Sequence, residues 1–228
     1  NQKGIRIIGD IPIYVNFDSV DVWKHPELFK LDKEKRPVTI AGVPPDYFSK
    51  TGQRWGNPVY QWHVLKESGY EWWIKRIEYN LRMFNLVRID HFRGFLAFWE
   101  IPASENTAIN GKWTKAPGED FFSVLTERFP ALPIIAEDLG VITEDVKEMA
   151  HRFGFPGMKI LMFAFGHDLP TNPYIPHNLY KNCIVYTGTH DNNTVKGWFE
   201  NELSTQDKER LFKYFGRKIT KDEIHWEL

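Results

Sequence analysis

Four acidic residues stand at the ends of four short apolar segments, and they are the side chains best suited to chemistry in this chain. Asp10, Asp90, Glu137 and Asp191 each follow a run rich in Ile, Val or Ala. The carboxyl ends of parallel strands meet at one edge of a sheet or barrel, where catalytic residues gather. Two carboxyl groups placed there, one ionised and one protonated, form the arrangement that breaks glycosidic bonds. A further carboxylate and a histidine would then hold sugar hydroxyls.

The clearest of these segments is residues 86–94, LVRIDHFRG, an apolar run that ends in charge. On a strand Arg88 and Asp90 would share one face, where two charges cost too much in a dry core unless they are paired. A neighbouring guanidinium keeps a carboxylate ionised and oriented, as a nucleophile requires. The alternative for Asp90 is a helix N-cap or a purely structural ion pair with Arg88 or Arg93.

Glu137 and Asp191 complete the set of candidate catalytic carboxylates. Glu137 follows Ile-Ile-Ala, and apolar surroundings raise a carboxyl pKa towards the range of a general acid. A glutamate at a helix N-terminus is the alternative. Asp191 could cap the helix expected from Thr194, but two asparagines beside it could do so as well. His190 taken alone is more often a simple loop histidine.

Regular elements alternate along most of the chain. Strands are expected over residues 5–10, 86–90, 134–138, 158–163 and 184–187, and helices over residues 71–85, 120–129, 143–153, 194–201 and 206–214. Strands that alternate with helices indicate parallel βα units and an α/β fold. No internal repeat, low-complexity tract or flexible linker marks a second domain.

Residues 16–70 lack this periodicity, since prolines, glycines and aromatic residues alternate there. The sequence predicts short helical pieces at most, and such a long loop in a compact domain is usually a lid or a binding loop. Trp55, beside Gly56 in a rigid turn, is expected to be an exposed platform on which a sugar ring stacks. Three further tryptophans are expected to pack in the core or on a helix: Trp62, Trp72 and Trp73.

Composition excludes several classes of function. Lys+Arg number 29 against Asp+Glu 30, so no basic excess indicates nucleic acid, and no run of 18 apolar residues predicts a membrane span. The single cysteine, Cys183, rules out an internal disulfide and fits a reducing compartment such as the cytoplasm. No metal-binding motif and no Gly-rich phosphate loop is present, so we expect no cofactor. The start at Asn1, directly before a strand, suggests part of a longer polypeptide.

Three segments resemble the catalytic segments of a known family: residues 88–94 (RIDHFRG), 136–140 (AEDLG) and 188–194 (GTHDNNT). The family is that of the 4-alpha-glucanotransferases, also called amylomaltases or disproportionating enzymes, which form glycoside hydrolase family 77 in the alpha-amylase superfamily. Residues 9–13 (GDIPI) are similar to its third-strand segment, and residues 54–58 (RWGNP) to its loop before the nucleophile strand.

The resemblance implies an α/β fold, the (β/α)8 TIM barrel, of which residues 1–228 would be a partial catalytic domain with roughly strands 3 to 7. Residues 16–70 would form an inserted substrate-cleft subdomain after strand 3. The resemblance implies that Asp90 is the nucleophile, Glu137 the acid/base and Asp191 the transition-state stabiliser. It also implies a set of substrate-binding residues: Arg88, His190, Asp10, Trp55 and Asn57. Five strands cannot close a barrel, so the remainder of its own barrel is an expected partner.

The activity implied is transfer of α-1,4-glucan segments between maltooligosaccharides by a retaining double displacement, within glycogen, starch or maltose metabolism. Two alternatives stay open. One is an alpha-amylase-type hydrolase, which would typically carry a calcium site and a β-sandwich tail. The other is an inactive glucan-binding fragment in which the carboxylates are idle.

Overall fold

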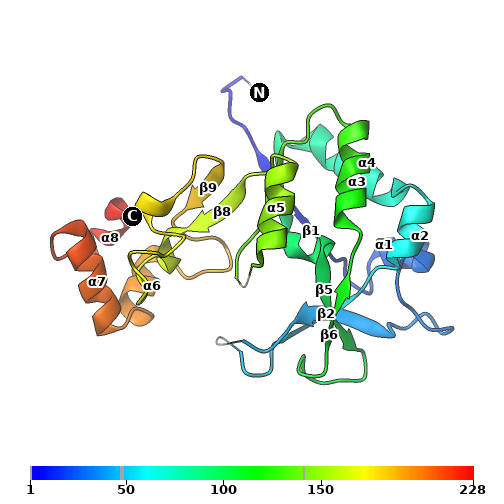
Figure 1. Ribbon diagram of the computed structural model, residues 1–228, viewed down its shortest axis with the longest axis horizontal. Helices are drawn as coiled ribbons and strands as arrows, with labels where there is room; N and C mark the ends of the chain where they lie inside the picture. The colour runs from blue at the N-terminus through cyan, green and yellow to red at the C-terminus, as the bar shows by residue number, and fades with distance from the viewer. Residues whose placement is uncertain (1, 47–48, 141) are drawn as a thin grey trace. The chain divides into compact units, whose positions relative to one another are not determined.

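The computed structural model describes residues 2–46, 49–140 and 142–228, and the chain divides into two compact units, Asn1–Phe155 and Pro156–Leu228. The first unit contains a three-stranded and a four-stranded sheet, and the second a two-stranded sheet with helices (Figure 1). The assignment of residues 1–228 to one partial barrel domain, with residues 16–70 as its insert, stays a prediction.

The elements of each unit follow one another in chain order. The first unit has β1 (Ile8–Pro12), α1 (Val20–Lys24), η1 (Pro26–Leu28), β2 (Thr39–Val43), β3 (Gln53–Pro58), α2 (Trp62–Glu67), α3 (Glu71–Met83), β4 (Leu86–Asp90), η2 (Phe92–Phe95), β5 (Ala97–Pro102), β6 (Lys112–Lys115), α4 (Gly118–Arg128), β7 (Ile134–Ala136) and α5 (Glu144–Arg152). The second has β8 (Gly157–Ile160), η3 (Leu161–Phe163), η4 (Pro176–Asn178), β9 (Cys183–Tyr186), α6 (Val195–Asn201), α7 (Thr205–Phe215) and α8 (Ile224–Glu227).

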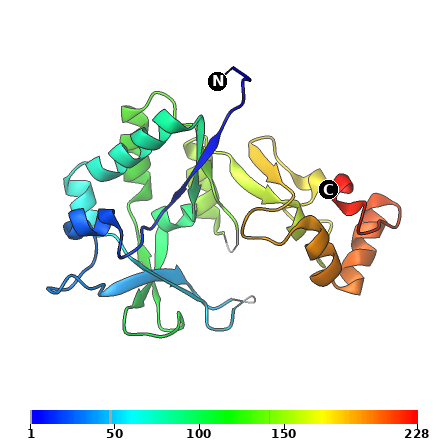
Figure 2. The same cartoon turned by 180° about the vertical axis from the view of Figure 1, so that it is seen from behind.

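The parallel sheet of the first unit has the strand order β1-β4-β7, and its central strand has the predicted bounds. Helices α3 and α5 cover one face of this sheet in Figure 1, and Figure 2 shows β1 from the other side with no helix in front of it. Exposure alternates along β1, where Gly9 and Ile11 are buried while Ile8 and Asp10 are exposed. One face of the sheet therefore packs on helices, and the other presents Asp10.

Helix α3 packs on this sheet through the apolar face that its sequence predicts. Trp73 and Ile77 are fully buried, and Leu81 and Phe84 pack at the edge of the same core. The predicted core positions of the tryptophans are confirmed for Trp73 and Trp62, which are buried, and Trp72 is partly buried. Aromatic rings that meet edge-on or offset, such as these, add to the stability gained by burial.

The expectation of only short helical pieces in residues 16–70 is wrong. Strands β2 and β3 and helix α2 lie in this segment, and the four-stranded antiparallel sheet has the order β3-β2-β5-β6. The strands escape pattern analysis because Gly42 interrupts β2 and because β3 reads QRWGNP, with little apolar alternation. Cross-strand pairing, which a local pattern does not contain, determines their conformation. Helix α1, capped by the Ser19 hydroxyl, is a short helical piece of the kind expected in this segment.

Gly42 is required by the close approach of β2 to β3. A Cβ at Gly42 would lie 2.1 Å from the carbonyl oxygen of Gln53 and 2.6 Å from Ile101 Cδ1. We expect Gly42→Ala to lower the free energy of unfolding by about 1–3 kcal/mol, because a backbone oxygen cannot move aside without breaking the sheet. Denaturant unfolding tests this, with Gly166→Ala as the control, whose Cβ would meet only the flexible Asp168 carboxylate at 3.1 Å. Equal effects in both variants would contradict the prediction.

The second unit is built on β8 and β9, which pair in parallel. The strand expected over residues 158–163 is shorter than predicted, since its second half forms the 3-10 turn η3. Helix α6 begins after Thr194, whose hydroxyl accepts a hydrogen bond from the Gly197 N–H at 3.1 Å. The five predicted strands are all present, but β1, β4 and β7 form one sheet whereas β8 and β9 form another.

Neither a membrane-spanning helix nor a metal-binding cluster is found within residues 2–46, 49–140 and 142–228. In these ranges no helix has the length and apolar character needed to cross a membrane. In the same ranges no group of three or more His, Cys, Asp or Glu side chains is placed to hold a metal ion.

Candidate active site

Arg88 joins the two strand-end aspartates of the first unit. In the β1–β4 register Asp10 lies opposite Arg88. Arg88 Nη1–H donates to Asp10 Oδ1 at 2.7 Å, and Nη2–H donates to Asp90 Oδ1 at 2.5 Å. The arginine side chain is 9% exposed, whereas those of Asp10 and Asp90 are 46% and 41% exposed. The guanidinium is thus buried beneath two carboxylates that remain open to solvent.

The Arg88 side chain stays positively charged in this position. Burial alone would lower the pKa of the guanidinium, but the hydrogen bond to Asp10 and the charges of Asp90 and Asp10 raise this pKa above its ordinary value. The predicted same-face pairing of Arg88 and Asp90 is confirmed. Arg88 therefore fixes the orientation of Asp90, with one oxygen of that carboxylate bonded to a permanent cation.

Replacing Arg88 by Met leaves two carboxylates close together without their shared cation. We expect Arg88→Met to lower the free energy of unfolding by about 2 kcal/mol at neutral pH, since a partly buried ion pair is broken but both carboxylates stay accessible to water. Unfolding should be measured at pH 7 and pH 3. An equal loss at the two pH values would contradict the electrostatic cause.

Glu137 lies directly beside Asp90, at the end of the adjacent strand. The Glu137 N–H continues the β4–β7 ladder by donating to the Ile89 carbonyl at 3.0 Å. Its carboxylate accepts hydrogen bonds at both oxygens, from the His91 N–H at 2.7 Å and from the Leu139 N–H at 2.9 Å. These bonds fix the carboxyl group at the carboxyl edge of the parallel sheet.

The environment of Glu137 favours its protonated form. Burial and then the negative charge of Asp90 raise the pKa of Glu137 to about 7, against the opposing effects of the two backbone hydrogen bonds and Arg88. The expectation of a raised pKa is confirmed, with Asp90 as an additional cause. Environments that separate two neighbouring carboxyl groups in this way assign one as the acid and leave the other as the ionised partner.

Strand β3 carries Trp55 and Asn57. The Trp55 indole meets the His91 ring edge-on, with ring centroids 4.8 Å apart and an interplanar angle of 86°. Trp55 is 37% exposed, as expected of a surface platform, and its Nε1–H donates to Gln53 Oε1 at 3.0 Å. Asn57 Nδ2–H donates to the Val15 carbonyl at 3.0 Å, which joins β3 to the segment after β1.

Two residues of this site were not singled out from the sequence. His91 follows Asp90 in a left-handed backbone conformation, with φ 51°, and burial together with the charge of Arg93 lowers its pKa to about 4. Its ring is therefore neutral near pH 7. Tyr14 packs against Trp55, with ring centroids 6.2 Å apart, and burial raises its pKa well above the ordinary value. The position of His91 next to the candidate nucleophile was the one available signal.

His190 and Asp191 belong to the second unit, after β9. Their side chains approach each other, with His190 Nε2 and Asp191 Oδ1 3.5 Å apart, and both are strongly exposed, 70% and 69%. The N-cap of α6 is Thr194, so Asp191 does not serve as that cap. A role for both residues beside the carboxylates of the first unit stays a prediction.

The whole chain, residues 1–228, matches the glycoside hydrolase family 77 profile, described as 4-alpha-glucanotransferase. Curated relatives with that name include one from Thermus thermophilus. It is 54% identical over an alignment of 231 positions, which covers 99% of this chain and 46% of the relative. Another, from Clostridium butyricum, is 53% identical over 224 residues, which are 98% of this chain and 45% of the relative.

A solved structure is similar as well. The amylomaltase from Streptococcus agalactiae in complex with acarbose matches with a TM-score of 0.91 and 50% identity, over 95% of this chain and 43% of that chain. This likeness indicates a fold of the amylomaltase, (β/α)8-barrel type, of which the chain is a part. The chain spans about half the length of the curated relatives it matches.

Proposed function

This chain belongs to the 4-alpha-glucanotransferase family, glycoside hydrolase family 77, and on this premise we propose that it carries out glucan transfer. The donor would be an α-1,4-linked maltooligosaccharide, and the acceptor a second such chain. The observation that carries the proposal is the pair formed by Asp90, bonded to a permanent cation, and Glu137, whose pKa is raised to about 7. A nucleophile and an acid are thereby provided side by side.

In the first step, an Asp90 carboxylate oxygen attacks the anomeric carbon of the donor. The bond from that carbon to the leaving glycosidic oxygen breaks, and the proton of Glu137 passes to this oxygen. Arg88 holds Asp90 and Asp10 in place by donating a hydrogen bond to each. The products are a shortened glucan and a glycosyl ester on Asp90.

In the second step, ionised Glu137 accepts the proton of the acceptor's 4-hydroxyl group. The hydroxyl oxygen attacks the anomeric carbon, the ester bond to Asp90 breaks, and both carboxyl groups return to their starting states. Two inversions at one carbon retain its configuration. Trp55, which lies over His91 at the edge of the site, would stack on a sugar ring and hinder water from taking the acceptor's place.

Residues of the second unit complete this proposal. Asp191 would stabilise the positive charge that develops on the sugar ring, and His190 would bind a hydroxyl of the same ring. Asp10 and Asn57 would shape the cleft around it.

Strands β1, β4, β7, β8 and β9 would correspond roughly to strands 3 to 7 of the family barrel. The remainder of that barrel would be the partner that covers the exposed face of β1.

A reducing compartment, the cytoplasm, fits the single cysteine, Cys183. The proposal is for carbohydrate metabolism there, on glycogen, starch or maltose-derived chains. Plant relatives carry the words chloroplastic/amyloplastic in their names, so location varies among family members.

Incubation of the chain with maltotriose, followed by chromatography, tests the proposed reaction. Glucose together with a ladder of longer maltooligosaccharides is expected, and Asp90→Asn should produce neither. Glucose and maltose without a ladder would replace the transferase proposal with that of an alpha-amylase-type hydrolase. No turnover by a folded chain would overturn the proposal for these residues and favour a glucan-binding role.

A further inference from the structure

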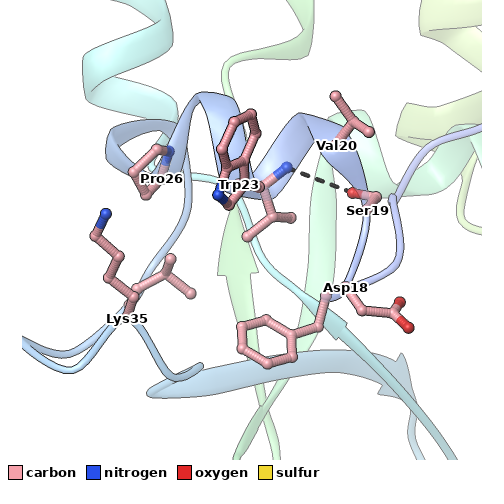
Figure 3. A pocket seen from close by; sticks show the side chains of 9 residues that line it. Asp18, Ser19, Val20, Trp23, Pro26 and Lys35 are labelled. Carbon is pink, nitrogen blue, oxygen red and sulfur yellow. Dashed lines mark hydrogen bonds between the residues drawn. The ribbon is translucent and has the colours of Figure 1, made fainter.

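A pocket of about 390 Å³ lies on the first unit outside the candidate active site, lined by side chains between Phe17 and Lys35 (Figure 3). Its walls come from the segment before α1, from α1 itself and from the turn that precedes β2. Small-molecule sites usually have volumes of about 300–1,000 Å³ and mostly apolar walls with a few polar groups. The pocket meets both conditions.

The apolar walls of this pocket are unusually exposed for such large side chains. Trp23 is 82% exposed, Val20 73% and Phe17 42%. The frame beneath them is fixed, because Val22 and Phe29 are buried in the core. A rigid frame that holds an aromatic patch open to solvent marks a binding surface, since little conformational entropy is lost when a ligand covers it.

Two charged side chains stand on opposite sides of the pocket in Figure 3, Asp18 and Lys35. Among the residues that the structure describes, neither side chain makes a hydrogen bond or an ion pair. Lys35 has φ 61°, a left-handed conformation held by its N–H bond to the Asp32 carbonyl at 3.0 Å. An unoccupied carboxylate acceptor and an unoccupied ammonium donor therefore flank an exposed indole.

We propose that this pocket is a second glucan-binding site, which takes an α-1,4-linked maltooligosaccharide. A pyranose ring has apolar C–H faces that suit an indole, and its hydroxyl groups both donate and accept hydrogen bonds, which suits Lys35 and Asp18. The inference rests on the proposed function, which supplies glucan as the ligand. A site that holds one part of a long chain raises the local concentration of the rest near the catalytic carboxylates.

Fluorine-19 NMR of the chain labelled with 5-fluorotryptophan tests this inference. The nine tryptophans give separate signals, and Trp23→Phe, Trp55→Phe and Trp226→Phe variants assign three of them. Maltoheptaose is then titrated into the Asp90→Asn protein, with cellopentaose as the β-linked comparison. We expect the Trp23 and Trp55 signals to shift with maltoheptaose, and the Trp226 signal to stay constant although this ring is 83% exposed.

Variants of the pocket separate it from the catalytic cleft. Trp23→Ala should weaken the second binding event about tenfold and leave the Trp55 shift unchanged. Lys35→Met should weaken it less, and Trp226→Ala not at all. Because Trp23 is exposed, its replacement should not disturb folding, which the Trp55 signal also monitors.

The outcomes distinguish this inference from the proposed function. A Trp55 shift without a Trp23 shift would overturn the second site and leave the transferase proposal intact. A Trp23 shift without a Trp55 shift would support the pocket and count against the cleft. Equal shifts of the Trp23 and Trp226 signals would overturn the inference. A Trp23 shift that depends on protein concentration instead of glucan concentration would also overturn it and would indicate association of two copies.

Discussion

Asp90→Asn is expected to reduce transfer from maltotriose roughly 10⁴-fold or more, since loss of a catalytic nucleophile typically costs this much. The amide keeps the shape of the carboxylate. Its Oδ1 can still accept the hydrogen bond from Arg88 Nη2–H, which spans 2.5 Å to the Asp90 carboxylate. It cannot form the glycosyl ester, so the first step is lost. The rate of donor consumption, followed by chromatography, measures the effect.

The same substitution should change the neighbouring carboxyl group. The negative charge of Asp90 is the second largest cause of the raised pKa of Glu137, after burial. Its removal should therefore shift that pKa downward from about 7, which carbon-13 NMR of labelled glutamate detects.

Asp120→Asn is a matched control for this variant. Asp120 is 44% exposed and ion-paired with Lys66 at 3.0 Å, so its charge change and exposure resemble those of Asp90. Normal transfer is expected in this variant. A comparable loss of transfer in Asp120→Asn, or an unchanged pKa of Glu137 in Asp90→Asn, would contradict the assignment.

The parallel strands of the first unit and the contact between Arg88 and Asp90 could be predicted because the information is local. A strand whose charges lie at positions i and i+2 places them on one face whatever the rest of the chain does. The apolar setting of Glu137 is local as well, in Ile-Ile-Ala, and burial is indeed the largest cause of its raised pKa. The acidic residue whose charge also raises this pKa, Asp90, could be named from the sequence, but its position relative to Glu137 could not.

What the sequence did not reveal depends on long-range pairing. Strand β3 has almost no apolar alternation and exists because β2 offers it hydrogen bonds. The contact of Trp55 with His91 depends on that pairing and on the left-handed backbone conformation of His91. Glycine and asparagine adopt this conformation more readily than histidine does. The pocket beside α1 could not be predicted either, because residues 16–70 lack the periodicity that distinguishes exposed from buried positions.

Glu137→Gln is expected to reduce transfer from maltotriose about 10²- to 10⁴-fold, the usual contribution of a general acid. The amide has no proton to give to the leaving glycosidic oxygen. A donor with a leaving group that needs no proton, α-maltosyl fluoride, should therefore form the glycosyl ester with a much smaller loss. Comparison of the two donors separates loss of the acid from general damage to the site, and Glu148→Gln, a change at an exposed position on α5, is the control.

The pH dependence gives this prediction its second test. Glu137 must carry a proton in the first step and its pKa is about 7, so the rate with maltotriose should fall as pH rises above 7. Well above this pKa, the rate should fall about tenfold for each further pH unit. With maltosyl fluoride, whose leaving group needs no proton, this alkaline fall should be absent both before and after the Glu137→Gln substitution. An alkaline fall that persists in the variant would contradict the role of Glu137.

Stability should follow the same titration with a definite sign. The pKa of Glu137 in the folded protein, about 7, lies above the ordinary glutamate value of 4.5, so the folded state holds the proton more tightly than the unfolded chain does. Its contribution to stability is fully present below pH 4.5 and is lost as pH rises through about 7. In Glu137→Gln this dependence should vanish, while stability below pH 4.5 should fall by about 1–2 kcal/mol. The reason is that one amide oxygen cannot accept both backbone N–H groups, from His91 and Leu139, that the carboxyl group now satisfies.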